Sequence, residues 1–172
     1  MNKKSIKKEK SYFESLLSVK RVTKVVEGGR IFSFSAFIVV GDKEGLAGYA
    51  KGKAKEVSNA KNKAIQKAKK NLVRIPIYQG RTIHHDVKAK VGSTKIMLRR
   101  AKAGTGIIAG PNVRSVLQNI GLKDIVAKSH GSSNVYTSAM AVFKALSKIN
   151  TPKLISQKRQ KKLEEISVVQ NK

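Results

Sequence analysis

The sequence predicts an α+β fold built from two successive units, the first an antiparallel sheet with one helix and the second a further block of strands and helices. Between residues 16 and 51 the apolar side chains alternate with period two, as they do in half-buried strands. Between residues 57 and 72 they recur at helical spacing instead. Pro76 and Gly80 then interrupt the pattern, and a second block of strand and helix signals follows. With 172 residues and a hydrophobic fraction of 40%, the chain can fill two small cores.

The first two strands flank the triplet Gly28-Gly29-Arg30, which predicts a hairpin with a tight, glycine-containing turn. The strand signal begins near Leu16. The second strand covers Ile31–Val40 and places these residues on one face: Phe32, Phe34, Ala36, Ile38 and Val40. We interpret Phe32 and Phe34 as core residues, with stacking on bases as the minority alternative.

A third strand and a helix complete the first unit. Asp42–Gly45 predicts a second turn, and Leu46–Lys51 predicts the third strand. The helix lies within residues 55–72, where the apolar stripe consists of Val57, Ala60, Ala64, Ala68 and Leu72. Because most of this stripe is alanine, the helix can pack closely on the sheet, while its lysines lie largely off the stripe.

The second unit begins with two strands around Gly92, within residues 86–101. A glycine-rich loop over Ala103–Gly110 leads to a helix that begins at Pro111 and closes at Gly121. Proline just inside the start of a helix and glycine just past its end follow the usual asymmetry of helix termini.

A short strand over residues 122–128 and one more helix follow. Ser133 or Asn134 would cap this helix, whose apolar face consists of Val135, Ala139, Val142, Leu146 and Ile149. The expected organisation is a disordered basic arm at 1–11, a first domain at 12–75, a second domain at 76–150 and a charged tail at 151–172.

The charge of the chain points to a polyanionic partner. Lys and Arg outnumber Asp and Glu by 37 to 10, and the formal net charge is +27. Nucleic acid is the first candidate, because neutralising phosphates releases counterions and yields affinity. An anionic membrane is the second, but no apolar stretch of about 18 residues is present to span a bilayer. The chain has no cysteine, so we expect a cytoplasmic protein without disulfides.

The sequence gives little support for an enzymatic function, and we expect no cofactor, no metal and no small-molecule substrate. The glycines of Ala103–Gly110 match neither a phosphate-binding loop nor the dinucleotide pattern G-x-G-x-x-G. We interpret this loop as a tight connection beneath a helix. The intermediate hypothesis is that its exposed N–H groups and Arg114 bind a backbone phosphate. His84-His85-Asp86 is expected to be a surface strand, because neighbouring residues on a strand face opposite sides.

Several basic and loop residues are candidates for contact with RNA. In the hairpin these are Lys20, Arg21, Lys24, Gly28, Gly29 and Arg30, where glycines permit close approach of the backbone and the cations can meet phosphates. The alternative is a plain turn with solvated charges. Further candidates are Lys51, Lys53, Lys55, Lys63, Arg114, Ser132, Ser133 and Asn134. The serines are equally explained as helix caps, although the start of a helix is also an anion site.

Several motifs in a fixed order make the chain resemble one family. They are RVTKVVEGGRIFSFSAFIVVGD, GKAKEV, KAKKNLVRIPI, AGTGIIAG and AKSHGSSN. Together, over about Val19 to Ile149, they resemble bacterial ribosomal protein five of the small subunit, the S-five family. The chain departs from the usual pattern at turns and helix starts: Ala50, Ser58, Ala103, Pro111-Asn112 and Val135.

The resemblance implies a first domain similar to double-stranded-RNA-binding domains and a second α+β domain of the type named after this family. It also implies a structural, non-enzymatic constituent of the small ribosomal subunit that binds ribosomal RNA, with small-subunit proteins four and eight as neighbours. The hairpin loop Lys24–Arg30 would reach RNA near the head–neck junction, so the protein would help to assemble the head–body region. Proximity to the messenger RNA entry and an influence on translational accuracy are implied too. A nucleoid-like nucleic-acid-binding protein is the alternative.

Overall fold

The structure, a computed structural model, describes residues 11–167, so nearly all of the predicted basic arm and the end of the predicted tail lie outside the described residues. The chain divides into two compact units. Among the described residues, the first contains 11–74 with the segment Asn119–Gly121, and the second contains Ile75–Gln118 and 122–167. Both units combine strands and helices, which confirms the predicted fold class.

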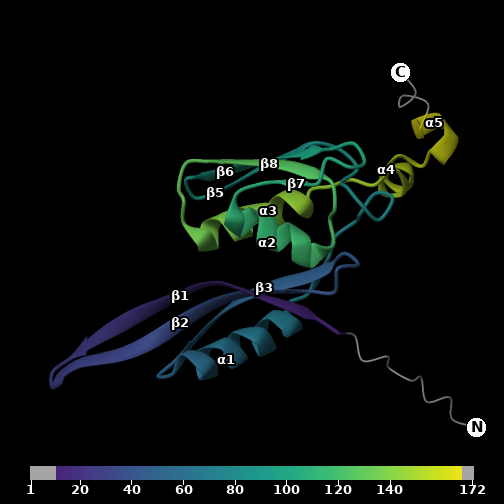
Figure 1. Cartoon of the computed structure of the whole chain (residues 1–172). Helices are drawn as coiled ribbons and strands as arrows, with labels where there is room; N and C mark the ends of the chain where they lie inside the picture. Colours follow the sequence, from purple (N-terminus) through teal and green to yellow (C-terminus); the bar gives the residue numbers. More distant parts are fainter. Residues whose placement is uncertain (1–10, 168–172) are drawn as a thin grey trace, which may run out of the picture. The chain divides into compact units, whose positions relative to one another are not determined.

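The first unit is an antiparallel four-stranded sheet with one helix (Figure 1). Its elements are β1 (Phe13–Val26), β2 (Gly29–Gly41), β3 (Leu46–Ala54), α1 (Val57–Lys70) and β4 (Val73–Arg74). The strands lie side by side in chain order. The prediction did not contain β4, which adds only two pairs to the edge of β3.

The hairpin between β1 and β2 turns at Glu27 and Gly28, since Val26 already pairs with Gly29. Gly29 has a φ of +129°, a backbone conformation that residues with a Cβ rarely adopt. The turn thus lies one residue earlier than the predicted triplet, and Arg30 belongs to the second strand.

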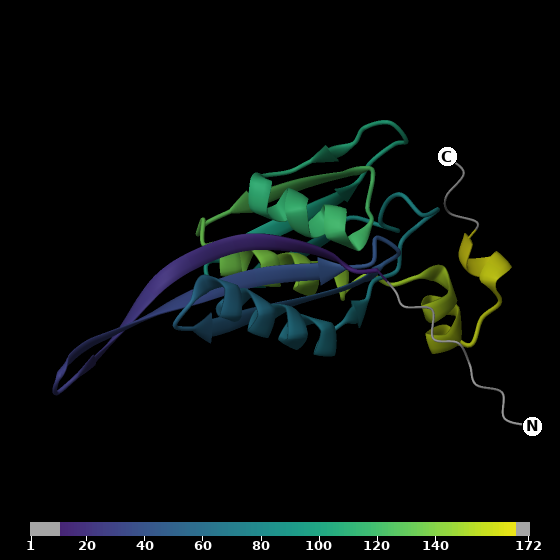
Figure 2. The ribbon, with the colours of Figure 1, turned by 60° about the horizontal axis from the view of Figure 1, so that its bottom comes forward.

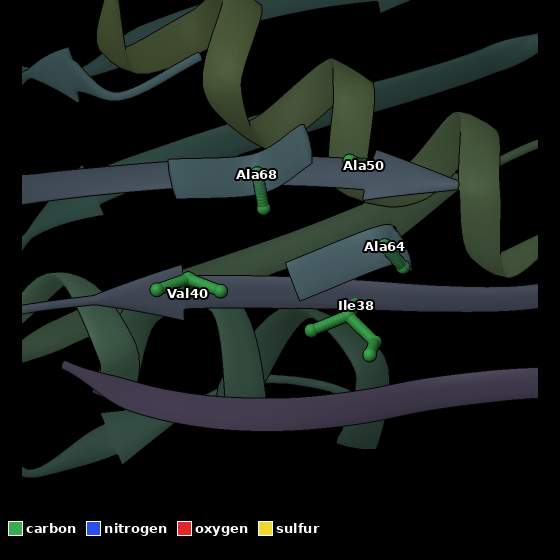
Figure 3. Packing of buried hydrophobic residues seen from close by; sticks show 5 residues of the cluster. All are labelled: Ile38, Val40, Ala50, Ala64 and Ala68. Atoms are coloured by element: carbon green, nitrogen blue, oxygen red, sulfur yellow. The ribbon is translucent and has the colours of Figure 1, made fainter. Parts of the chain in front are cut away.

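The core of the first unit lies between the sheet and α1. Ala60, Ala64 and Ala68 are buried, as the alanine stripe predicts. Figure 3 shows the cluster around them, which consists of Ile38, Val40, Ala50, Ala64 and Ala68. The approach is so close that a Cβ on Gly52 would lie 2.2 Å from the Ala60 carbonyl oxygen. Small residues on both elements therefore set the distance between helix and sheet.

The prediction that Phe32 belongs to the core is wrong. Phe34 pairs with Ala54, the last residue of β3, so the part of β2 before Phe34 pairs with β1 alone. We call this two-stranded part, residues 22–33, the hairpin arm; Figure 2 shows it extending past β3. With no layer to cover it, Phe32 is 46% exposed, whereas Phe34 at the base of the arm is half-buried.

The second unit is a mixed four-stranded sheet with helices. Its strands are β5 (Val87–Val91), β6 (Thr94–Arg100), β7 (Ile107–Ile108) and β8 (Ile125–His130), in the order β5-β6-β8-β7. Only β7 runs parallel to its neighbour. The helices are α2 (Pro111–Ile120), α3 (Val135–Leu146), α4 (Pro152–Arg159) and α5 (Leu163–Ser167). Helix α3 packs against β5 and β6 and buries most of its apolar face there.

Two short helices occupy the described part of the segment predicted as a charged tail. Helix α4 has Thr151 as its cap, whose side chain accepts a hydrogen bond from the Leu154 N–H at 3.3 Å. Pro152 occupies the first turn, where its missing N–H costs nothing. A Thr-Pro pair is thus a helix start here, within the segment 151–172 for which the sequence predicts a charged tail.

Candidate nucleic-acid interface

The pairing of the strands decides which face of the first sheet each predicted RNA contact occupies. Residues directly opposite one another on paired strands share a face. Arg21 pairs with Phe34, and Phe34 belongs to the same face of β2 as Ile38, which packs on α1. Arg21 and Arg30 therefore lie on the helix-covered side of the sheet, Arg30 in the hairpin arm and Arg21 at its base.

The lysines of the strands lie on the other side. Lys20 pairs with Ser35, and Ser35 pairs with Lys53, so the two lysines belong to one row across three strands. Two strand spacings separate them, about 10 Å. Lys24 and Lys51 share this face, and all four lysines are exposed. We call Lys20, Lys24, Lys51 and Lys53 the lysine face.

Arg21 is held by an aromatic ring. Its guanidinium carbon lies 3.8 Å from the centroid of the Phe32 ring, a cation–π contact that presents the guanidinium on the surface of the hairpin arm. Phe32 thus supports a cation. Glu27, at the turn, is the one opposing charge among residues 20–33, against four cations.

The tip of the hairpin arm is bare. A Cβ added at Gly28 or Gly29 would meet nothing within 4 Å, and Val25 beside them is 74% exposed. The tip therefore has room for another backbone to approach it closely, with Lys24 on one face and Arg30 on the other.

The two other basic candidates of the first unit are not part of the lysine face. Lys63 is exposed on α1, which packs on the opposite face of the sheet. Lys55 is exposed in the connection between β3 and α1. The structure therefore separates the predicted contacts of this unit into the hairpin arm, the lysine face and the helix.

The candidates in the second unit lie at the starts of two helices. Arg114 is exposed in the first turn of α2. Asn134 caps α3, because its side-chain oxygen accepts a hydrogen bond from the Tyr136 N–H at 3.1 Å. The Ser132 hydroxyl accepts one from the Asn134 N–H at 3.2 Å. Asn134 is thus the cap of α3, Ser132 stabilises the turn before it, and Ser133 is exposed.

The glycine-rich loop has an anchor that the sequence analysis missed. One carboxylate oxygen of Asp124 accepts hydrogen bonds from the N–H groups of Gly104 and Gly106, each 3.0 Å long. The other accepts one from Arg81 Nε at 2.8 Å. The Asp124 side chain is only 4% exposed. A carboxylate directly before an apolar strand was the available signal, but nothing in the sequence connects it to a loop about twenty residues earlier.

These contacts change the acidity of Asp124. The Gly106 N–H contributes most to lowering the pKa of Asp124, burial opposes it, and the Arg81 guanidinium and the Gly104 N–H lower it further. The carboxylate is therefore charged at neutral pH, and its charge holds the loop in place. This observation agrees with the reading of the loop as a tight structural connection.

The expectation of a surface strand at His84-His85-Asp86 is wrong, because these residues lie in a connection before β5. The His85 Nε2 atom accepts a hydrogen bond from the Asn150 N–H at 3.1 Å, and its Nδ1 lies 2.9 Å from the Asp86 carbonyl oxygen. The His84 ring stacks edge-on against Tyr78, and burial lowers the pKa of His84. Across residues 11–167, no group of three or more metal-ligating side chains occurs.

In the described part of the chain, no helix is both long and apolar enough to cross a membrane.

Comparisons with known proteins give a consistent result. The family model described as ribosomal protein S5, N-terminal domain, matches residues 12–76, and that of the C-terminal domain matches residues 89–159. The small ribosomal subunit protein uS5 of Rickettsia africae is 56% identical over 162 residues, which cover 94% of this chain and 92% of the relative. That of Rickettsia rickettsii is 55% identical over 162 residues, and that of Rickettsia peacockii is 57% identical over 155 residues.

Proposed function

The chain belongs to the ribosomal protein S5 family and is a structural, non-enzymatic constituent of the small ribosomal subunit, and from this premise we propose that it binds small-subunit ribosomal RNA through its hairpin arm and lysine face. The protein accordingly functions in the ribosome, in the cytoplasm. The family membership settles the class of the protein, and the geometry above supports the residues proposed here.

The observation that carries the proposal is a two-stranded arm with cations on both faces and a bare tip. Lys24 lies on one face and Arg30 on the other, the Arg21 guanidinium reaches over Phe32 from the base of the arm, and Gly28 and Gly29 leave the tip without side chains. Side chains on both faces of an uncovered ribbon can contact two phosphate backbones at once. Arginine suits this task because its planar guanidinium can bind one phosphate through two hydrogen bonds.

The other predicted contacts are assigned more simply. Lys51, Lys53, Lys55 and Lys63 would add phosphate contacts around the arm. Arg114 and the exposed Ser133 would meet phosphates at helix starts, where free N–H groups favour anions. We propose that residues 12–75 form the first, RNA-binding domain and that residues 76–150 form the second domain. The basic segment at residues 1–11 and the charged tail at residues 151–172 flank these domains.

The finer biological role is supported by the sequence motifs that resemble the family. In this proposal the hairpin contacts RNA near the head–neck junction and helps to stabilise the head–body region. Small-subunit proteins four and eight are the proposed neighbours, the messenger RNA entry lies nearby, and translational accuracy responds to the contact with protein four.

Sedimentation of the tagged protein through a sucrose gradient tests the proposal. The gradient is run at low and high salt, with and without ribonuclease. We expect stoichiometric migration with the small subunit at high salt, lost after ribonuclease treatment. Release at modest salt, together with equal binding to duplex DNA, would instead favour a nonspecific, nucleoid-like protein.

A further inference from the structure

The second unit has a basic surface that the sequence analysis did not assign. Along β5 and β6, buried and exposed residues alternate, so that Val87, Ala89 and Ile96 face the core. The side chains between them point to the other side of the sheet. We call this side the open face; it consists of Lys88, Lys90, Lys95, Met97, Arg99, Val126, Lys128 and His130.

The strand register places these residues in rows across the sheet. Lys90 pairs with Lys95, which pairs with His130, so three polar side chains lie side by side across three strands. In the next row Met97 lies between Lys88 and Lys128. The three strands span about 10 Å, and the distance from the first row to Arg99 is about 13 Å along the strands. Five lysine and arginine side chains therefore share a small area.

Little negative charge opposes this surface. Between Ile75 and Lys162 the carboxylates are Asp86 and Asp124, and Asp124 is buried against Arg81. Asp86 lies at one corner, with its Oδ2 3.8 Å from Arg99 Nε. Both side chains of that pair are more than half exposed, so water screens the interaction and leaves the surface positive.

The shape and composition of the open face favour one kind of ligand. A hollow of about 460 Å³ is lined by Lys88, Lys90, Lys95, Met97, His130 and Lys148, among others. The open face contains no Phe, Tyr or Trp, so it offers no ring on which a base could stack. Lysines around a shallow hollow suit a sugar–phosphate backbone, which they contact as point charges.

Resting on the proposed function, we propose that the open face is a second RNA-binding surface that holds a backbone segment of small-subunit ribosomal RNA. The hairpin arm and the lysine face belong to the first unit, so this surface adds a sheet-based RNA contact in the second unit to the contacts proposed for Arg114 and Ser133. An acidic surface of another protein is the competing occupant, and the test separates the two.

The main experiment replaces one lysine on each of three strands in the full chain: Lys88→Gln, Lys95→Gln and Lys128→Gln. Glutamine keeps most of the side-chain length and removes the charge. The control variant carries Lys123→Gln, Lys153→Gln and Lys158→Gln, three exposed lysines of the same unit that lie outside the open face. The affinity for protein-free small-subunit ribosomal RNA is measured from 50 to 400 mM KCl.

We expect the open-face variant to lower the salt slope by about two to three units, since each phosphate contact contributes somewhat less than one. The control should change it by less than one unit, and Lys→Arg at the three open-face positions should restore the slope. Equal slopes for the open-face and control variants overturn this inference while leaving the proposed function intact. Wild-type protein that does not bind the RNA overturns both.

A second measurement uses the unmodified chain and so does not depend on the folding of a variant. Free and RNA-bound protein are acetylated briefly, and lysine modification is read by mass spectrometry. Protection of Lys88, Lys95 and Lys128 by RNA alone is expected. If these lysines are protected only in the assembled subunit and not by RNA, a protein occupies the open face and the inference is wrong.

Discussion

At the residue scale, Phe32 supports a charged side chain on an uncovered strand. Its ring lies under the Arg21 guanidinium at 3.8 Å, and almost half of its surface stays exposed. Ile38, six residues further along the same face of β2, is fully buried. The two apolar residues therefore contribute differently: Ile38 stabilises the fold, and Phe32 orients a cation.

We expect Phe32→Ala to lower the free energy of unfolding by about 1 kcal/mol or less, because an exposed cation–π contact contributes only about that much. Ile38→Ala should cost about 2–5 kcal/mol as a truncation in a packed core. Urea unfolding of both variants checks the difference. Phe32→Ala should nevertheless weaken RNA binding, and a large loss of stability from this variant would show that Phe32 is core after all.

Asp124 links stability to pH. Its pKa is lowered in the folded protein, chiefly by the Gly106 N–H, so the folded state holds this proton more weakly than the unfolded chain does. The resulting stabilisation is complete above the usual aspartate pKa of 3.8 and is lost as the pH falls through the lower folded value. Urea unfolding at pH 7, 4 and 3 should show this loss.

The variant Asp124→Asn should be less stable than the wild type at pH 7, because an amide N–H₂ would then face Arg81 Nε–H instead of a carboxylate oxygen. Its stability should also fall less between pH 4 and pH 3. Asp86→Asn is the matched control: this exposed carboxylate accepts the Arg100 N–H, which an amide oxygen can still do. A pH response of Asp124→Asn equal to that of the wild type would contradict the assignment.

Single residues were predictable from the sequence where periodicity alone determines their surroundings. The alanines of α1 are such a case, since a helix with one small-residue face packs that face on its neighbour. Phe32 was not predictable in this way, because alternation shows which face of a strand a residue occupies but not how far the layer that covers this face extends. Asp124 was not predictable either, since its partners are two backbone N–H groups and an arginine more than forty residues earlier.

At the scale of elements, the contact between α1 and β3 depends on small residues. Gly52→Ala would place a Cβ 2.2 Å from the Ala60 carbonyl oxygen and 2.6 Å from the Ala64 nitrogen, so the helix must move. We expect a loss of about 1–3 kcal/mol or more in the free energy of unfolding. Gly28→Ala, where the new methyl group meets nothing within 4 Å, should change it by about 0.5 kcal/mol or less. Equal costs in a urea titration would refute this account of the contact.

The hairpin arm should contribute to RNA binding and little to folding. Lys24→Gln with Arg30→Gln removes one cation from each face of the arm, and we expect the slope of log affinity against log salt to fall by about one to two units. The same variant should unfold at nearly the wild-type urea concentration, because both side chains are exposed. Filter binding at several KCl concentrations measures the slope. An unchanged slope would remove Lys24 and Arg30 from the interface.

The long elements were predictable from the sequence, while the short ones were not. The strands of residues 13–54 and the helix 57–70 show their period over several turns or pairs. By contrast, β4 and β7 have two residues each and exist because a neighbouring strand pairs with them. Helix α4 is an intermediate case, since its Thr151-Pro152 start is visible in the sequence once proline is read as a first-turn residue.

At the scale of the whole molecule, the charge can be counted from the sequence, but its distribution needs the strand register. Lys20 and Lys53 are 33 positions apart and belong to one row. Lys95 and His130 are 35 positions apart and are direct partners. Neither row can be recognised as a sequence motif, because each strand contributes only one side chain to a row. The basic surfaces of this protein therefore depend on strand pairing, which brings together side chains that lie far apart in the sequence.

The net charge of +27 should make salt act in opposite directions on folding and on RNA binding. In the free protein, like charges repel across the surface, and salt screens this repulsion over about 10 Å at 0.1 M. Raising KCl from 50 to 400 mM should therefore increase Tm, by about 2–4 °C for each kcal/mol of repulsion removed. Over the same range, affinity for RNA should fall steeply, because releasing the counterions of the RNA into more concentrated salt yields less free energy.

The variant with glutamine at Lys88, Lys95 and Lys128 provides the control, since its formal charge is 27 − 3, or +24. Its Tm should respond less to KCl than that of the wild type, when both are followed by circular dichroism without RNA. A Tm that falls with salt would mean that the attraction of ion pairs such as Glu14–Lys69 outweighs the repulsion among the lysines. The expected rise in Tm follows from the small number of carboxylates, because ten of them cannot neutralise thirty-seven cations. Repulsion among the remaining cations therefore destabilises the folded chain until a polyanion binds or salt screens the charges.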